Sequence, residues 1–227
     1  MILIKTLELN LYKLNTYLIA GPENVNSETI LKNETKESAL IRLVTDFAYD
    51  GLNVFQLRCK DFSKNELYKI AEKIGSNLIN TKCKFCINDD VDVTIMLKEK
   101  VNILHLGQDD MHPTEAKKMI GDNISLGLSI TDIKQIYKIP EIVDYIGVGP
   151  IYKTDSKSDA SKPMGVSVLR NIIEEVKIPV VAIGGLQLKN IPQLKQIGVS
   201  GFAIISAIFG EKDPQSSFKQ YKQLAKF

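Results

Sequence analysis

Residues 144–157 read Asp144-Tyr145-Ile146-Gly147-Val148-Gly149-Pro150-Ile151-Tyr152-Lys153-Thr154-Asp155-Ser156-Lys157. After Asp144, an apolar run leads into a loop of hydroxyl and charged side chains. Residues 145–148 predict a buried strand, because short β-branched and apolar runs bounded by Gly or Pro are typical of strands. The loop crowds hydroxyls together with lysine amines, which indicates a site for a multiply charged phosphate. A helical period follows at 166–176, so the stretch predicts one strand–loop–helix unit.

The same alternation of apolar runs and helical periods continues through all 227 residues. Strands are predicted at 17–20, 54–60, 84–88, 103–106, 125–129, 145–148, 180–183 and 201–205. Helices are predicted at 37–49, 63–80, 91–98, 113–120, 132–137, 166–176, 188–196 and 214–225. Eight such units are expected to close into one α/β domain, a (β/α)8 TIM barrel, whereas an open doubly wound sheet usually stops at about five or six strands.

We expect residues 1–227 to form this single domain, with 1–16 as an extension before the first strand. The 29 basic and 27 acidic residues give a net charge of +2 without a basic stripe, so no nucleic-acid partner is expected. No run approaches the roughly 20 apolar residues that span a bilayer, so we expect no membrane partner and a cytoplasmic location. The sequence does not set the oligomeric state, and a homo-oligomer is compatible with it.

Three cysteines are an odd number, and Cys83 and Cys86 form a C-x-x-C. Because no second pair or nearby histidine completes a zinc site, both are interpreted as structural.

Cationic side chains follow the second predicted strand, at Gln56-Leu57-Arg58-Cys59-Lys60. Side chains alternate along a strand, so Leu57 and Cys59 should meet the outer helices while Gln56, Arg58 and Lys60 face the barrel interior and mouth. An Arg fork beside a compact Lys charge suits a diphosphate. The alternative is that these cations only pair with Asp89 and Asp110.

Carboxylates end the third and fourth predicted strands, in Asn88-Asp89-Asp90 and Gly107-Gln108-Asp109-Asp110. Asp89 and Asp110 can project toward one point above the barrel and, with waters and phosphate oxygens, meet the octahedral oxygen coordination of Mg²⁺. Asp90 and Asp109 are the competing candidates, since one of each pair could instead cap a helix or support the other carboxylate.

The last two strands end in Gly184-Gly185 and in Ile205-Ser206. In many barrels the loops at these positions bind a phosphate monoester through backbone N–H groups and a short helix. The loop 153–163, after the sixth strand, is expected to act as a flap over the same mouth. Two anion sites in one mouth suit an enzyme that joins two phosphorylated substrates with loss of diphosphate.

The chain resembles the thiamine phosphate synthase family from about residue 17 to its end. The motifs that carry the resemblance are Q-x-R-x-K (Gln56, Arg58, Lys60), N-D-D (Asn88, Asp89, Asp90), H-x-G-Q-x-D (His105, Gly107, Gln108, Asp110), G-x-S (Gly127, Leu128, Ser129), G-P-I-x-x-T-x-[TS]-K (149–157), and the G-G and I-S elements (Gly185, Ile205, Ser206). No single motif is diagnostic, whereas all of them in order are highly specific.

The resemblance implies a Mg²⁺-dependent transferase that condenses two small molecules, hydroxymethylpyrimidine diphosphate and hydroxyethylthiazole phosphate, by a dissociative route. The diphosphate would be held by Arg58, Lys60, Asn88, Ser129 and Lys157, with Asp89 and Asp110 on the metal and Gln56 beside the pyrimidine; Arg58, Lys60, Ser129 and Lys157 are the catalytic candidates. The thiazole phosphate would be held by Thr154, Ser156, Gly185, Ile205 and Ser206. This chemistry needs no proton transfer at the attacking nitrogen, so His105 and His112 are interpreted as structural or supporting residues.

The sequence departs from the family pattern at a few positions. Lys153 stands where Pro is frequent, Ser156 where Thr is frequent, and Thr131 where a His is common. That missing His argues against the related thiazole tautomerases, which use one in this region. A sugar-phosphate isomerase would leave Gln56 and Asp89 unused, and a non-catalytic sensor of thiamine phosphates would not need metal ligands.

Overall fold

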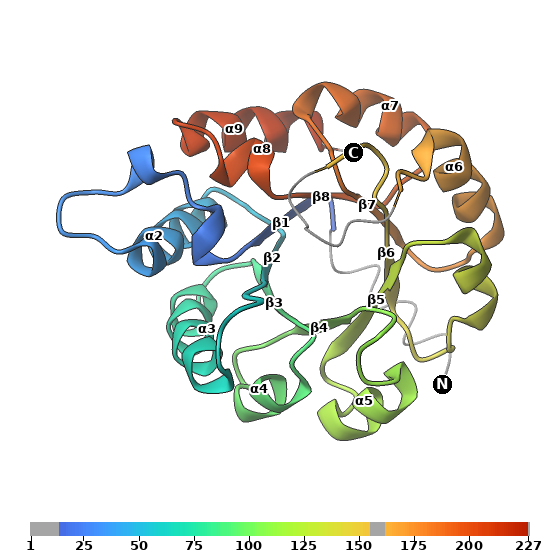
Figure 1. Cartoon of the computed structure of the whole chain (residues 1–227), viewed down its shortest axis with the longest axis horizontal. Coiled ribbons are helices and arrows are strands. Elements are labelled where there is room, and N and C mark those ends of the chain that lie inside the picture. Colours follow the sequence, from blue (N-terminus) through green and yellow to red (C-terminus); the bar gives the residue numbers. More distant parts are fainter. Residues whose placement is uncertain (1–13, 155–161, 227) are drawn as a thin grey trace.

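The computed structural model describes residues 14–154 and 162–226, which form a closed barrel of parallel strands surrounded by helices (Figure 1). The strands are β1 (Thr16–Ala20), β2 (Val54–Leu57), β3 (Lys84–Asn88), β4 (Ile103–Leu106), β5 (Ser125–Ile130), β6 (Tyr145–Val148), β7 (Val180–Ile183) and β8 (Gly201–Ile204). The α-helices are α2 (Lys36–Tyr49), α3 (Lys64–Leu78), α4 (Val91–Met96), α5 (Pro113–Ile120), α6 (Gly165–Glu175), α7 (Ile191–Gln196), α8 (Ser206–Phe209) and α9 (Pro214–Leu224). The 3-10 turns are η1 (Pro22–Asn24), η2 (Ser27–Thr29), η3 (Ile133–Lys138) and η4 (Leu188–Asn190).

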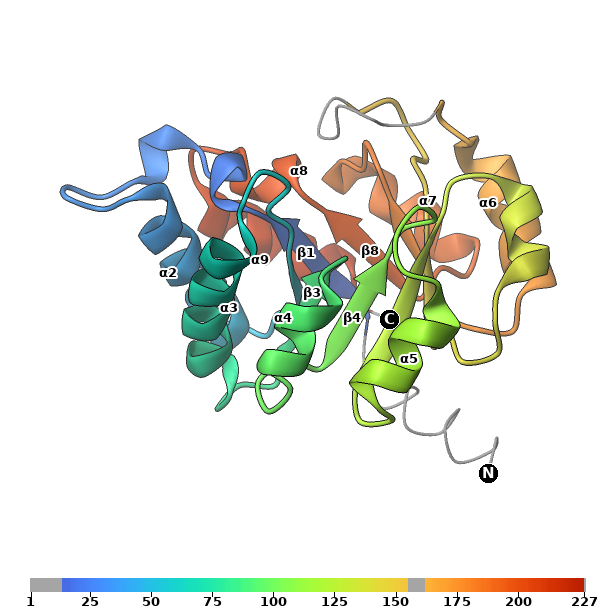
Figure 2. The same ribbon diagram turned by 60° about the horizontal axis from the view of Figure 1, so that its bottom comes forward.

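Barrel closure is made by β8 and β1, which pair in parallel with Tyr17 opposite Ala203. Every other strand pairs in parallel with its sequence neighbour, so the strand order is the chain order. The predicted (β/α)8 barrel is therefore confirmed. Because every pairing is parallel, the carboxyl ends of all strands lie on the same side, where the loops that carry the predicted site residues emerge; the arrows of β4 and β8 show this direction in Figure 2.

Helix starts follow the expected capping chemistry. Ser63 caps α3 in a reciprocal capping box with Glu66, and Pro113 and Pro214 stand in the first turns of α5 and α9. The segment predicted as a helix at 132–137 is instead the 3-10 turn η3. Pro140 explains the difference, because it holds the preceding Ile139 in an extended conformation (φ −68°, ψ 119°) and stops a longer helix.

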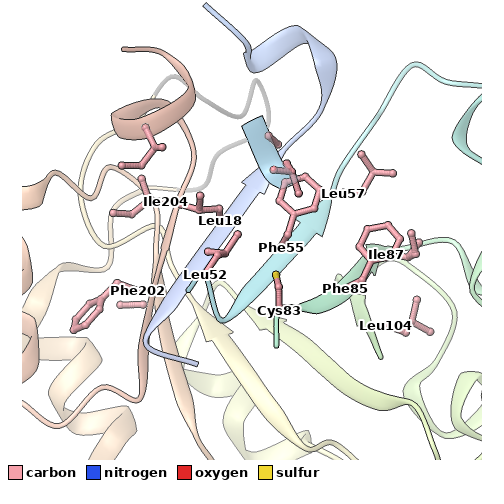
Figure 3. Close-up of a cluster of buried hydrophobic side chains, with 14 of the residues drawn as sticks. Leu18, Leu52, Phe55, Leu57, Cys83, Phe85, Ile87, Leu104, Phe202 and Ile204 are labelled. Carbon is pink, nitrogen blue, oxygen red and sulfur yellow. The ribbon is translucent and has the colours of Figure 1, made fainter. Parts of the chain in front are cut away.

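Two layers of apolar side chains fill the molecule. The larger lies between strands and helices and includes Phe55 and Phe85, whose rings stack with centroids 6.3 Å apart (Figure 3). The smaller fills the barrel interior and includes Tyr17, Cys86 and Tyr145. Among the described residues, no helix is long and apolar enough to cross a bilayer.

Candidate active site

Inward-facing polar side chains gather near the carboxyl ends of β2 to β5. They line a small cavity of about 20 Å³ together with apolar groups of neighbouring strands: Tyr17, Ile19, Gln56, Asn88, His105, Ser129, Tyr145, Gly147, Val181, Ile183 and Ala203. Gln56 and His105 are only 2% and 7% exposed. The barrel thus brings together three predicted substrate-binding residues, Gln56, Asn88 and Ser129.

An unbroken series of hydrogen bonds crosses this interior and links Gln56 to Ser129. Gln56 Nε2 donates to the hydroxyl of Tyr17 at 2.8 Å, and that hydroxyl lies 2.8 Å from the hydroxyl of Tyr145. The Tyr145 hydroxyl lies 2.9 Å from Nδ1 of His105, whose Nε2 lies 3.0 Å from Oγ of Ser129. We call these five residues the interior hydrogen-bond chain.

Tyr17 and Tyr145 are functional candidates that the sequence analysis missed. Burial in the barrel raises the pKa of both phenols well above the usual value, with Cys86 adding to the shift, so they stay protonated. The signal was present, since a tyrosine at an inward position of an apolar strand needs a hydrogen-bond partner for its hydroxyl.

Two glycines make room for this chain. A Cβ on Gly127 would lie 2.4 Å from Nδ1 of His105 and 2.4 Å from Cζ of Tyr145. A Cβ on Gly147 would lie 3.1 Å from Cε1 of His105. The Gly of the G-x-S motif is therefore required by the two rings that lie over it.

The structure separates the two neighbouring carboxylates after β3. Oδ1 of Asp90 accepts a hydrogen bond from the backbone N–H of Val93 at 2.8 Å and caps α4. Asp89 is exposed, has a left-handed backbone (φ +65°) and is contacted by the amide of Asn88. Asp90 is thus used within the fold, while Asp89 faces solvent at the mouth.

Asp110 is held by its own loop. Its Oδ2 accepts a hydrogen bond from the backbone N–H of Gly107 at 2.6 Å, and a Cβ on Gly107 would lie 2.9 Å from that oxygen. The described residues hold no cluster of three or more His, Cys, Asp and Glu suited to a metal. Two exposed carboxylates still fit Mg²⁺, which usually keeps several waters and takes the rest of its ligands from substrate phosphates.

The prediction that β2 extends to Lys60 is wrong, because the strand ends at Leu57. The neighbouring strand β1 ends at Ala20, whose carbonyl accepts the last bond from the N–H of Arg58, and Pro22 then begins η1. β1 therefore does not continue beside Cys59 and Lys60. Cys59 nevertheless packs on the outer core as expected, Arg58 is half-buried, and Lys60 is exposed.

A second, larger cavity of about 810 Å³ lies over the ends of β7 and β8. It is lined by Asn24, Lys153, Thr154, 183–188, 203–207, Glu211, Ser217 and Gln220, so it contains the predicted Thr154, Gly185, Ile205 and Ser206. Gly184 and Gly185 have positive φ, and a Cβ on Gly185 would lie 2.4 Å from the carbonyl oxygen of Lys153. The glycine pair lets the loops after β6 and β7 touch. Ser156 and Lys157 lie outside the described residues.

Comparisons with known proteins agree with this arrangement. Residues 28–208 match the family model described as thiamine monophosphate synthase. A thiamine-phosphate synthase of Lactococcus lactis subsp. lactis (strain IL1403) is 31% identical over 92% of this chain and 95% of its own, and one of Syntrophomonas wolfei is 32% identical over 88% and 98%. A solved thiamine phosphate pyrophosphorylase from Pyrococcus furiosus, 27% identical, superposes with a TM-score of 0.79 over 94% of this chain and 96% of that one. With the motif residues gathered at one barrel mouth, these matches show that the chain belongs to the thiamine monophosphate synthase family of transferases.

Proposed function

We propose that this chain joins hydroxymethylpyrimidine diphosphate to hydroxyethylthiazole phosphate, forming thiamine monophosphate and releasing diphosphate. Family membership supports the reaction, because relatives that match over most of their length carry the name thiamine-phosphate synthase. The observation that carries the proposal is that two chemically different regions share one mouth: the polar residues of β2 to β5 and the glycine-lined cavity at β7 and β8.

The pyrimidine diphosphate would bind over β2 to β5. Gln56 would lie beside the ring, and the diphosphate would be bound by Arg58, Lys60, Asn88, Ser129 and Lys157. The half-buried Arg58 offers a planar fork of donors and Lys60 a compact charge, two cation types that together match a diphosphate. Ser129 stands at the end of the interior hydrogen-bond chain.

Asp89 and Asp110 would hold Mg²⁺ between β3 and β4, with water and diphosphate oxygens as the remaining ligands. When bound, the ion would neutralise part of the negative charge of the departing diphosphate. The exposure of both Asp89 and Asp110 after neighbouring strands supports the assignment, since Mg²⁺ takes carboxylate ligands while keeping several waters.

The thiazole phosphate would occupy the larger cavity. Its phosphate would accept hydrogen bonds from the hydroxyls of Thr154, Ser156 and Ser206 and from the backbone N–H groups of Gly185, Ile205 and Ser206. The positive φ of Gly185 and the absence of a side chain there support this, because a glycine lets the backbone approach a ligand closely.

The reaction would be dissociative. The bond between the pyrimidine methylene carbon and the diphosphate oxygen breaks first, and its electron pair leaves with the diphosphate. The lone pair of the thiazole nitrogen then forms the new C–N bond, with no proton to remove from that nitrogen. The side chains therefore need to neutralise the leaving group and to hold the nucleophile close.

Diphosphate release from the purified protein tests the proposal, measured with both substrates, with each alone, and with Mg²⁺ or excess chelator. We expect release and thiamine phosphate formation only with both substrates and metal. Binding of both ligands without any release would contradict the proposal and favour a sensor.

A further inference from the structure

We infer that the interior hydrogen-bond chain holds His105 in the tautomer with its proton on Nε2, so that Ser129 accepts from His105 and turns its own hydroxyl proton toward the mouth. Tyr17, Tyr145 and His105 are then positioning residues for Ser129. The inference rests on the proposed function only for the identity of the anion that receives this proton, the pyrimidine diphosphate.

Two proton arrangements run in one direction along the whole series of hydrogen bonds. In the outward arrangement Tyr17 donates to Tyr145, Tyr145 donates to Nδ1 of His105, and Nε2–H donates to Oγ of Ser129. In the inward arrangement Ser129 donates to Nε2, Nδ1–H donates to Tyr145, and Tyr145 donates to Tyr17. Gln56 Nε2 donates to Tyr17 in both arrangements.

The partners of Tyr17 favour the outward arrangement. In the inward one, the Tyr17 hydroxyl accepts two hydrogen bonds and its proton goes to Sγ of Cys86, 3.6 Å away. In the outward one, the same proton goes to the Tyr145 oxygen at 2.8 Å. Sulfur is a weak acceptor, so the outward arrangement gives every proton of the chain a strong oxygen or nitrogen acceptor.

The ligand side of Ser129 favours the same direction. Phosphate oxygens are acceptors, so a serine that binds them must donate its proton. In the inward arrangement that proton already goes to His105, which leaves only lone pairs facing the anion. The backbone of Ser129 is fixed as well, because its carbonyl accepts from Nε2 of Gln108 at 2.6 Å.

Close packing leaves the His105 ring little room to tilt. Gly127 and Gly147 lie against the ring. An added Cβ on Gly127 would lie 2.4 Å from Nδ1, and one on Gly147 would lie 3.1 Å from Cε1. Tyr17 and Tyr145 are each 1% exposed, and their raised pKa keeps both hydroxyl protons in place at neutral pH. The buried residues thus set the donor-to-acceptor direction of the interior hydrogen-bond chain, and Ser129 presents the result at the mouth.

Nitrogen-15 NMR of the ligand-free wild-type protein tests the tautomer directly. The protein has two histidines, His105 and His112. His112 is exposed and caps α5, so a His112→Gln variant removes its signals and leaves those of His105. We expect a pyrrole-like, protonated Nε2 and a pyridine-like Nδ1 for His105. A proton on Nδ1 would overturn the inference. This readout needs no turnover, so it stands apart from any failure of the proposed function.

Tyr145→Phe tests whether the tautomer matters for Ser129. It removes the acceptor and donor between Tyr17 and His105, so we expect a mixture of His105 tautomers. We also expect kcat to fall about 10-fold, within the range of one weakened hydrogen bond to a charged group, while KM for the pyrimidine diphosphate changes less than about 3-fold.

Tyr221→Phe is the matched control. Its buried hydroxyl accepts from the N–H of Tyr17 at 2.8 Å and donates to the carbonyl of Phe202 at the opposite end of the barrel. We expect this variant to lose stability without changing the His105 tautomer or kcat. Wild-type kcat and a single Nε2–H tautomer in Tyr145→Phe would overturn the positioning role, as would an equal kcat loss in Tyr221→Phe.

Discussion

The backbone N–H of Val93 donates to Oδ1 of Asp90 at 2.8 Å, while the preceding Asp89 turns its carboxylate to the barrel mouth with a left-handed backbone. The two adjacent aspartates of this motif therefore differ in their contacts and in their exposure. Capping uses one oxygen of Asp90, whereas the carboxylate of Asp89 is exposed and accepts a hydrogen bond from the amide of Asn88. Neutralising each carboxylate in turn separates the two roles.

Asp89→Asn is expected to lower kcat/KM on the order of 10²–10³-fold, because it removes charge from the proposed metal site. Asn also tolerates positive φ, so the backbone should be retained. Asp90→Asn is the matched control: it removes the same charge, yet Asn is as good an N-cap, and we expect less than about 3-fold loss. Thermal shift gives a second readout, since Mg²⁺ with diphosphate should raise the melting temperature of Asp90→Asn and not of Asp89→Asn. Similar losses in both variants would contradict this division.

Gly107→Ala is expected to raise the Mg²⁺ concentration that gives half-maximal activity. The new Cβ would lie 2.9 Å from Oδ2 of Asp110, so the carboxylate must leave the Gly107 N–H. The displaced atom is the end of an exposed side chain, so the melting temperature should change little. Titration of activity with Mg²⁺ measures the effect, and an unchanged Mg²⁺ requirement would separate Asp110 from the metal.

The barrel could be predicted from sequence because each strand is a short apolar run between turn residues. Five of the predicted carboxyl ends of strands match the structure to the residue, at Ala20, Asn88, Leu106, Val148 and Ile183. The end of β2 could not be predicted, because it depends on where the neighbouring β1 stops, at Ala20. Local pattern does not carry that information.

Charged side chains at predicted strand ends could be picked out from the sequence as candidate site residues. Asp89 and Asp110 are recognisable in this way, but only the structure shows that Asp90 caps α4. Tyr17 and Tyr145 were missed because each belongs to an apolar run, a pattern that predicts a core residue. Their 2.8 Å contact joins β1 to β6, strands that are far apart in sequence and do not pair.

Gly185→Ala is expected to destabilise the fold and to raise KM for the thiazole phosphate. Its φ of +66° costs an L-residue about 1–3 kcal/mol, and the Cβ would also lie 2.4 Å from the carbonyl oxygen of Lys153, which belongs to the backbone and cannot swing away. Gly198→Ala is the control, because Gly198 also has a positive φ (+89°) but an added Cβ there would make only an ordinary contact, 3.7 Å from Cγ2 of Ile173. Chemical denaturation should therefore show a larger loss for Gly185→Ala. Equal losses would mean that the loop after β6 does not press on Gly185.

The three free thiols are expected to resist alkylation in the folded protein at pH 8. Burial raises the pKa of Cys59, Cys83 and Cys86 to about 12 each, so almost no thiolate is present to react. In the unfolded chain their pKa returns to about 9, and all three should label. Because the folded-state pKa is the higher one, the stability from these buried neutral thiols is complete below about pH 9 and is lost as the pH rises toward about 12. Mass spectrometry after iodoacetamide treatment, with and without denaturant, counts the labels; rapid native labelling of Cys83 or Cys86 would mean that β3 opens far more readily than its packing implies.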